Sequence, residues 1–185
     1  MMRIKKGVVI AISGKSVSGT ATIGKKLAKK LKLNYFDAGA YYKEHSKKRK
    51  EVERALELLR SKSGTSKPFH EHIDETQIEK AKKGNIVSCG KLAVCMLKDI
   101  ADVKIWIECS FNERARRMSK RDGIEYNEAK RKLKEKEQRE REMWKEIYGI
   151  DYFDQKKMAD IVIDSTNLTE EETLNRILKE IMAIT

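Results

Sequence analysis

The sequence has a single proline, three cysteines and no long apolar run. Cys89, Cys95 and Cys109 lack the spacing of a metal site, and two of them, Cys89 and Cys109, lie in apolar runs typical of core residues. No segment approaches the roughly 20 apolar residues of a membrane-spanning helix. The apolar run near the N-terminus is too short for a signal peptide. We therefore expect a soluble, cytoplasmic protein with no membrane contact.

Acidic residues are absent from the first 36 positions, which hold nine lysines or arginines, and Asp37 is the first carboxylate. The chain carries 41 basic and 29 acidic side chains, a formal net charge of +12. This charge favours polyanionic partners such as nucleotides, RNA or ribosomes, but it does not indicate a fold. A surface rich in Lys and Glu is also common in proteins from hot environments. The charge alone leaves both interpretations open.

Two further patterns are missing. His45, His70 and His72 have no partner set typical of a metal site, so we interpret them as surface residues. No stretch interleaves aromatic and basic residues as a platform for single-stranded RNA, so any RNA contact would be made to the phosphate backbone.

The length favours one domain. Short runs rich in Val, Ile and Tyr are each followed by a helical pattern, which is typical of a parallel sheet with helices on both faces. The predicted strands cover residues 8–13, 35–36, 86–89, 104–109 and 161–164. The sequence therefore predicts an α/β fold.

The helical segments are longer and strongly charged. Residues 41–66 read as helical, residues 62–68 as a turn, and residues 70–83 as a helix that ends at Gly84-Asn85. Residues 111–148 read as a helix, a short hinge at 121–123 and a long helix. Two apolar stripes predict buried helix faces; they consist of Ile23, Leu27 and Leu31, and of Leu174, Ile177, Leu178 and Ile181.

Residues 8–25 contain an apolar run, a loop framed by Gly14 and Gly19, and a lysine-rich helical pattern. This order is typical of P-loop nucleotide enzymes, whose loop amides bind phosphate at a helix N-terminus. Thr20 stands at the position of the lysine that contacts phosphate, and Ala21 at that of the hydroxyl that binds magnesium. The predicted phosphate-binding residues are Gly14, Lys15, Ser16, Val17, Ser18, Gly19, Thr20, Ala21 and Thr22.

Six blocks of sequence, in order, resemble the nucleoside monophosphate kinases, most closely the archaeal type of cytidylate kinase. They cover residues 12–20, 37–39, 81–87, 102–107, 148–151 and 160–166. The resemblance implies a three-layer P-loop kinase fold with a five-stranded parallel sheet, an inserted helical acceptor-binding subdomain and a short helical lid. In a single domain, 1–185, it implies a core of residues 1–36, 84–118 and 147–185, an acceptor-binding insertion at 37–83, and a lid with a long helix at 119–146.

The resemblance also implies transfer of the γ-phosphoryl group of ATP to CMP or dCMP with Mg²⁺. By comparison with the family's motifs, the acceptor-binding residues would be Asp37, Ala38, Gly39, Lys43, Asp74, Gly90 and Lys91. The catalytic residues would be Thr20, Lys91, Arg117, Arg121, Lys136, Arg139 and Arg141. Thr22, next to Ala21, would be the hydroxyl available to the metal.

Several positions depart from the family's pattern. Lysines occupy arginine positions at Lys43, Lys91 and Lys136, Ala21 lacks the hydroxyl, and Cys89 stands where a glutamate is expected. Lysine keeps the charge of arginine but loses the planar fork that fits phosphate. We expect these departures to lower the rate of turnover more than they lower the affinity for an anion.

Three hypotheses follow. We favour a nucleoside monophosphate kinase. The second hypothesis is a catalytically impaired relative that binds nucleotide, or RNA or the ribosome, through its basic surface. The third is a P-loop enzyme with a different acceptor, because Glu75, Thr76 and Cys89 alter the acceptor pocket.

Overall fold

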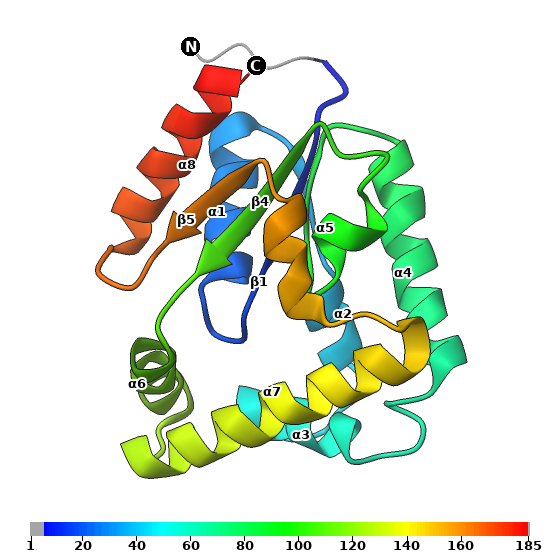
Figure 1. The fold of residues 1–185 in the computed structure, drawn as a ribbon, viewed down its shortest axis with the longest axis vertical. Helices are drawn as coiled ribbons and strands as arrows, with labels where there is room; N and C mark the ends of the chain where they lie inside the picture. Colours follow the sequence, from blue (N-terminus) through cyan, green and yellow to red (C-terminus); the bar gives the residue numbers. More distant parts are fainter. Residues whose placement is uncertain (1–5, 185) are drawn as a thin grey trace.

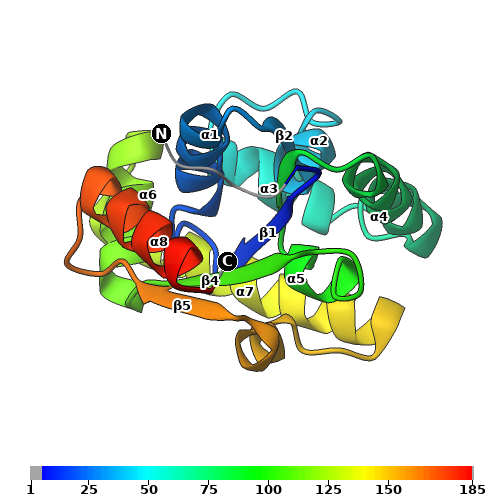
Figure 2. The ribbon, with the colours of Figure 1, turned by 90° about the horizontal axis from the view of Figure 1, so that it is seen from above.

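The computed structural model describes residues 6–184, so the first five residues of the predicted core and Thr185 lie outside it. Five strands form one sheet in the order β2-β3-β1-β4-β5, with every neighbouring pair parallel (Figures 1 and 2). The strands are β1 (Val9–Gly14), β2 (Asn34–Asp37), β3 (Ile86–Cys89), β4 (Val103–Glu108) and β5 (Ile161–Asp164). The predicted parallel α/β fold is confirmed.

Eight α-helices and one 3₁₀ helix, counted over residues 6–184, surround the sheet. They are α1 (Thr20–Leu31), α2 (Ala38–Lys43), α3 (Glu51–Leu59), α4 (Lys67–Lys82), α5 (Ala93–Met96), α6 (Phe111–Asp122), α7 (Tyr126–Tyr148), η1 (Tyr152–Met158) and α8 (Glu170–Ile184). Along the chain, helices α2, α3 and α4 come between β2 and β3, and α6 and α7 come between β4 and β5.

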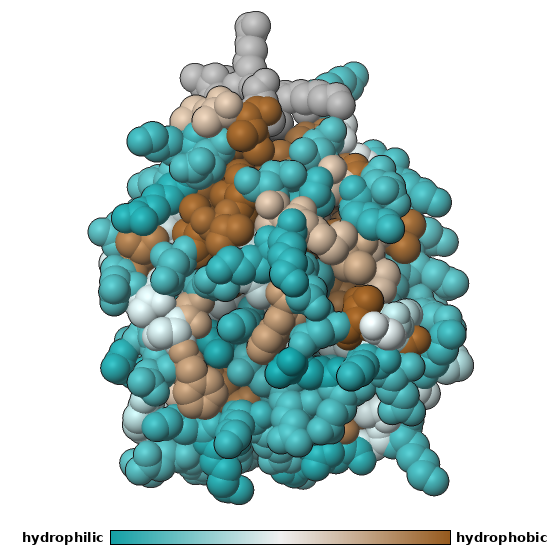
Figure 3. Space-filling view, in the orientation of Figure 1, coloured by the Kyte–Doolittle hydropathy of each residue, from teal (hydrophilic) through white to brown (hydrophobic). Residues whose placement is uncertain are grey.

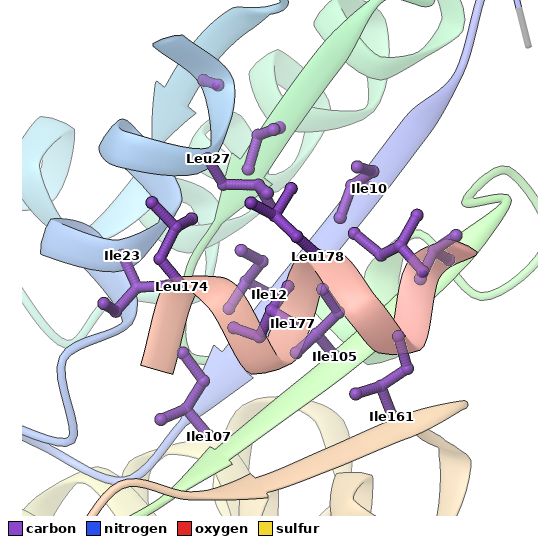
Figure 4. Packing of buried hydrophobic residues seen from close by; sticks show 14 of the residues in the cluster. Ile10, Ile12, Ile23, Leu27, Ile105, Ile107, Ile161, Leu174, Ile177 and Leu178 are labelled. Atoms are coloured by element: carbon purple, nitrogen blue, oxygen red, sulfur yellow. The ribbon is translucent and has the colours of Figure 1, made fainter. Parts of the chain in front are cut away.

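One face of the sheet is covered by α1 and α8. Alternate residues of β1, Ile10 and Ile12, point to this face and pack against Leu27 of α1 and Ile177 of α8 (Figure 4). All four side chains are fully buried. The apolar faces predicted for α1 and α8 are confirmed, with Leu31 partly buried at the edge. Alternate residues of a strand point to the same face of the sheet, and residues four apart lie on the same face of a helix. These two spacings bring the apolar side chains together between the sheet and the two helices.

The opposite face is covered by α4, α5 and η1. Val9 and Ala11 of β1 point here and pack with Ala81 of α4 and Val94 of α5. Further along the sheet, the indole of Trp106 is fully buried in a separate cluster that includes residues of α7 and η1. Both faces of β1 are therefore apolar, as expected for a central parallel strand.

The prediction of one helical stretch over residues 41–66 is wrong. Helix α2 ends at Lys43 and α3 begins at Glu51, and the connection holds four consecutive cations at positions 47–50. Their mutual repulsion disfavours a helix. The Ser46 hydroxyl also accepts a hydrogen bond from the amide of Lys48, a local contact that competes with helical pairing.

Helix α4 begins at Lys67, three residues before the predicted start, with Pro68 in its first turn. Proline is favoured there because its missing N–H would have no partner in the helix. The predicted stop is confirmed: Gly84 has a φ of 71° directly after the helix. The predicted hinge is confirmed as well, since Gly123 ends α6 with a φ of 61°.

The face of the molecule in Figure 3 is dominated by hydrophilic side chains, with separate apolar areas between them. Within residues 6–184, no helix combines the length and the apolar content needed to cross a membrane.

The carboxyl ends of the five strands meet at one edge of the sheet because all strands are parallel. In the sheet, β1 lies between β3 and β4, and the connections of the chain lead to strands on both sides of it. The loop after β1 therefore lies at the switch point where open α/β sheets bind ligands. The topology thus brings the segments after Gly14, Asp37, Cys89 and Asp164 to a common edge.

Helix α1 lies very close to β3 at Gly24, where an added Cβ would be 2.2 Å from the Cys89 Sγ. We predict that Gly24→Ala lowers the free energy of unfolding by about 1–3 kcal/mol through overpacking. Combining it with Cys89→Ala should recover at least ~1 kcal/mol, because the clashing atom is gone. Urea denaturation of the parent, both single variants and the double variant measures this coupling. Strictly additive effects would contradict the proposed contact.

Candidate active site

A cavity of about 780 Å³ opens at the carboxyl edge of the sheet. It is lined by the loop after β1, by α2, α3 and α4, by the segment after β3, and by the inward faces of α6 and α7. Most of the residues predicted from the sequence line it: Gly14, Ser16, Val17, Ser18, Gly19, Thr20, Ala21, Thr22, Asp37, Ala38, Gly39, Lys43, Asp74, Gly90, Lys91, Arg117, Arg121 and Lys136.

The loop after β1 is tightly folded. A Cβ at Gly14 would lie 2.5 Å from the Ile107 carbonyl oxygen, so no larger residue fits there without a shift. Val17 and Gly19 have positive φ values of 62° and 105°, which turn the backbone before α1. Gly19 is the N-cap of α1 and makes no side-chain cap, so the first amides of the helix remain available to an anion.

Arg117 of α6 lies over this loop. Its guanidinium donates to the carbonyl oxygens of Ser18 (3.3 Å) and Ser165 (2.6 Å) and pairs with Glu113 (3.1 Å). The Ser165 hydroxyl also donates to the Ser18 carbonyl at 3.1 Å. These contacts fasten the loop to α6 and to the segment after β5.

A buried charge cluster joins the loop to α7. Glu140 is 6% exposed and accepts hydrogen bonds from the Ser16 hydroxyl (3.0 Å) and the Tyr152 hydroxyl (3.3 Å). Lys136 forms an ion pair with Glu140 and donates to Ser16 at 2.7 Å. The Lys91 ammonium lies 4.0 Å from Glu140 and donates to the Gly14 carbonyl at 3.1 Å. Two lysines and one carboxylate therefore directly contact the loop after β1, which we call the phosphate loop (residues 14–22).

The pKa values of this cluster differ from ordinary ones. Burial lowers the pKa of Lys91 to about 7, although the nearby Glu140 carboxylate raises it. Burial raises the pKa of Glu140, but the charges of Lys136 and Lys91 outweigh that effect and the net pKa is lowered. Glu140 is therefore an ionised carboxylate, and Lys91 changes charge near neutral pH.

The other end of the cavity is formed by α2, α3 and α4. Asp37 caps α2, because its carboxylate accepts from the amides of Gly39 (2.9 Å) and Ala40 (3.1 Å). Beyond it, Lys43 and Arg121 both pair with one carboxylate, that of Glu51.

Aromatic and polar side chains complete this end. The Asp74 carboxylate accepts from the Tyr148 hydroxyl at 2.5 Å, and burial raises its pKa to about 6. The His70 ring contacts the rings of Tyr42 and Trp144. His70 is 3% exposed, so its interpretation as a surface residue is wrong: the ring is held by the Gly64 carbonyl oxygen at 2.9 Å.

Three predicted site residues are not among the described residues that line the cavity. Lys15 lies over the ring of Phe153, at 4.6 Å from its centroid. Arg139 pairs with Glu135 at 2.9 Å, and Arg141 pairs with Asp151. Both arginines lie off the inward stripe of α7, which runs through residues 136, 140, 143 and 144.

Three of the cavity residues that the sequence reasoning missed are polar side chains with defined partners, namely Glu140, His70 and Glu51. Glu140 follows Lys136 by four positions, a spacing that places both on one helix face. His70 shares the buried face of α4 with Ile73, Gln77 and Ala81, again at helical spacing. Nothing local marks Glu51, because its partners come from α2 and α6.

Oxygen donors for a metal lie beside the phosphate loop. The hydroxyls of Thr20 and Thr22 and the carboxylate of Asp37 line the cavity, whereas Ala21 offers none. Residues 6–184 hold no group of three acidic, histidine or cysteine side chains able to bind a metal ion. This donor set fits Mg²⁺ carried by a phosphate ligand, since protein sites supply few of its ligands in such cases.

Comparison with known proteins shows the family to which the chain belongs. The family model described as the cytidylate kinase-like family matches residues 9–167. A cytidylate kinase of Pyrococcus horikoshii is 35% identical over 90% of this chain and 84% of its own length. A cytidylate kinase of Methanocaldococcus jannaschii is 36% identical over 91% of this chain and 94% of its own length.

Solved structures agree in fold. The crystal structure of a shikimate kinase from Bacteroides thetaiotaomicron superposes with a TM-score of 0.61 at 20% identity, covering 95% of this chain and 98% of that one. At this identity the likeness concerns the fold alone.

We predict that Lys91→Arg abolishes part of the pH dependence of anion binding. The parent loses the Lys91 charge as the pH rises through about 7, whereas arginine stays charged. The parent-to-variant ratio of dissociation constants for pyrophosphate should grow about tenfold between pH 6 and pH 8. Isothermal titration calorimetry measures it. Lys156→Arg, an exposed pair with Glu108, is the matched control and should keep the dependence of the parent.

Proposed function

Because the chain belongs to the cytidylate kinase-like family, we propose that it transfers the γ-phosphoryl group of ATP to CMP or dCMP. The observation that supports this most directly is the single cavity that contains both the phosphate loop and the pocket of α2, α3 and α4. One volume can thus hold the donor and the acceptor together, and phosphoryl transfer depends mainly on such positioning.

The donor phosphates would lie on the loop from Gly14 to Thr22. The amides at the start of α1 and the positive end of the helix dipole favour an anion there. Lys91 and Lys136, both anchored on this loop, supply the positive charge that the missing lysine at position 20 would have given. Arg117 would cover the donor, because it already lies over Ser18.

The acceptor would lie between α2, α3 and α4. Lys43 and Arg121 face this space and can hold its phosphate, and Asp74 with its Tyr148 partner can hydrogen-bond a base. The aromatic rings of Tyr42 and Trp144 provide an apolar wall of the kind that ligand pockets use.

In the proposed reaction, an oxygen of the acceptor phosphate attacks the γ-phosphorus of ATP. The bond from that phosphorus to the bridging oxygen breaks, ADP leaves with the electron pair, and CDP is formed. The cations of Lys91, Lys136 and Arg121 would stabilise the negative charge on the transferred group, which is the main catalytic contribution in this chemistry. Lysines at positions 43, 91 and 136 keep that charge but lose the bidentate geometry of arginine, so we expect modest turnover.

Magnesium bound to the nucleotide would neutralise charge on the donor phosphates. Thr22 and Asp37 would hold it, and Thr20 offers a further hydroxyl, since all three residues line the cavity and carry side-chain oxygens. Position 21 contributes no oxygen, as its side chain is a methyl group.

The RNA- or ribosome-binding hypothesis rests on the net charge of +12, on the absence of acidic residues from the first 36 positions and on the departures from the family's pattern at the site. Many basic side chains are engaged in ion pairs with acidic neighbours, among them Arg60 with Glu135 and Lys132 with Glu128. The kinase hypothesis is supported by the cavity that contains both the phosphate loop and the pocket of α2, α3 and α4, so we retain it.

The direct test is a coupled assay of purified protein with ATP, Mg²⁺ and each nucleoside monophosphate. We expect ADP and the nucleoside diphosphate to form in equal amounts, fastest with CMP or dCMP. Absence of turnover with every monophosphate would contradict the proposal.

Arg121→Ala should lower kcat/KM by about 10³-fold, because a lost arginine at a transferring phosphate has effects of this order. Arg116→Ala is a matched control on the same helix, because that side chain is 68% exposed, pairs with Glu113 and is not among the described residues that line the cavity. An equal loss in both variants would indicate a structural effect and not a role at the phosphate.

Thr22→Val removes a hydroxyl while keeping the shape of the side chain. We expect about tenfold weaker binding of ATP in the presence of Mg²⁺ and unchanged binding of ATP in EDTA, because one oxygen near the metal is lost. Thr22→Ser keeps the hydroxyl and should bind like the parent. A loss of the same size in EDTA would show that Thr22 does not act through the metal.

A further inference from the structure

Glu51 is the first residue of α3, and its carboxylate lies on the wall of the cavity. Its Oε1 pairs with the Lys43 ammonium, and its Oε2 lies 3.3 Å from Nη1 of Arg121. These cations come from α2 and α6, both of which contact α3. One carboxylate thus lies between the two cations that face the end of the cavity formed by α2, α3 and α4, which we call the acceptor end.

The guanidinium of Arg121 is oriented independently of Glu51. Asp122 is 8% exposed and accepts from Nη2 at 2.6 Å and from Nε at 3.3 Å. This leaves Nη1 directed at Glu51. Asp122 also accepts from the backbone amide of Glu51 at 3.0 Å, so the start of α3 is anchored without the Glu51 side chain.

We propose that the Glu51 carboxylate occupies the position of the acceptor's phosphate and is exchanged for that phosphate when the acceptor binds. The proposal rests on the proposed function and adds a specificity-determining residue to it. Glu51 then keeps Lys43 and Arg121 in place in the free protein and makes their release depend on a phosphate-bearing acceptor.

The charges favour this exchange. A phosphate monoester carries −1.5 to −2 charges near pH 7 and three acceptor oxygens, against one charge on a carboxylate. Arginine and lysine bind such a group through short, charge-assisted hydrogen bonds. The Glu51 side chain is 41% exposed, so it can turn towards solvent at little cost. Burial raises the pKa of Glu51, but Lys43 and Arg121 outweigh this and the net pKa is lowered, which keeps it ionised.

The exchange would also change how the insertion contacts the lid. In the structure, Glu51 links Lys43 of α2 to Arg121 at the end of α6, next to the hinge at Gly123. An acceptor that lacks a phosphate leaves this link intact. A phosphate-bearing acceptor breaks it and takes over both cations.

The experiment compares Glu51→Gln with Glu53→Gln in the full chain. Glu53 lies on the same helix, is 38% exposed and pairs with Lys132 outside the cavity, so it is a matched control. Dissociation constants for CMP, cytidine and inorganic phosphate are measured by calorimetry, and urea denaturation checks the fold of each variant.

We expect Glu51→Gln to bind CMP and inorganic phosphate about tenfold more tightly than the parent, the effect of removing one unit charge near a phosphate at a protein surface. Cytidine binding should not change, and Glu53→Gln should behave like the parent. This gain in affinity is not what a merely structural role would produce. Unchanged or weaker phosphate binding, or an equal gain for cytidine, would overturn the proposal.

The phosphate measurement separates this proposal from the proposed function. If no nucleoside monophosphate is phosphorylated but Glu51→Gln still tightens phosphate binding, the exchange is supported and the kinase activity is refuted. If turnover is present but phosphate affinity is unchanged in Glu51→Gln, the kinase stands and the exchange is refuted.

Discussion

Two ammonium groups can lie beside the phosphate loop because a buried carboxylate lies between them. Glu140 carries the opposite charge, and it accepts hydrogen bonds from Ser16 and Tyr152 as well. Without it, Lys91 and Lys136 would repel each other in a poorly solvated space. The cluster also connects α7 to the loop after β1, so the shape of the cavity depends on the same contacts that hold its charge.

The acceptor end follows the same arrangement. Glu51 lies between Lys43 and Arg121 as Glu140 lies between Lys91 and Lys136. A strongly basic chain therefore presents a cavity in which four of the cations, Lys43, Arg121, Lys91 and Lys136, are paired with carboxylates. In the proposed exchange, a phosphate-bearing acceptor competes with the Glu51 carboxylate for Lys43 and Arg121, which links affinity to the phosphate group of the acceptor.

Local sequence patterns explain much of the fold. Short runs rich in Val, Ile and aromatic residues predicted all five strands, and the central strand β1 stands out because it is apolar on both faces. The glycine-framed loop and the helix ends at Gly84 and Gly123 could also be predicted from the sequence, because a positive φ strongly favours glycine. The break between α2 and α3 was missed because the Lys- and Glu-rich composition of residues 41–66 favours a helix, whereas repulsion within the run at 47–50 does not show in composition.

The sequence by itself determined the five strands, most of the helices, the phosphate loop and the family motifs, because each depends on neighbours along the chain. Only the tertiary structure decided which charged residues meet. Glu51 contacts cations of two other helices, His70 is buried beneath aromatic rings, and Arg139 and Arg141 lie off the inward face of α7. The physical reason is that ion pairs and burial depend on distances between segments far apart in the chain, which residue spacing does not specify.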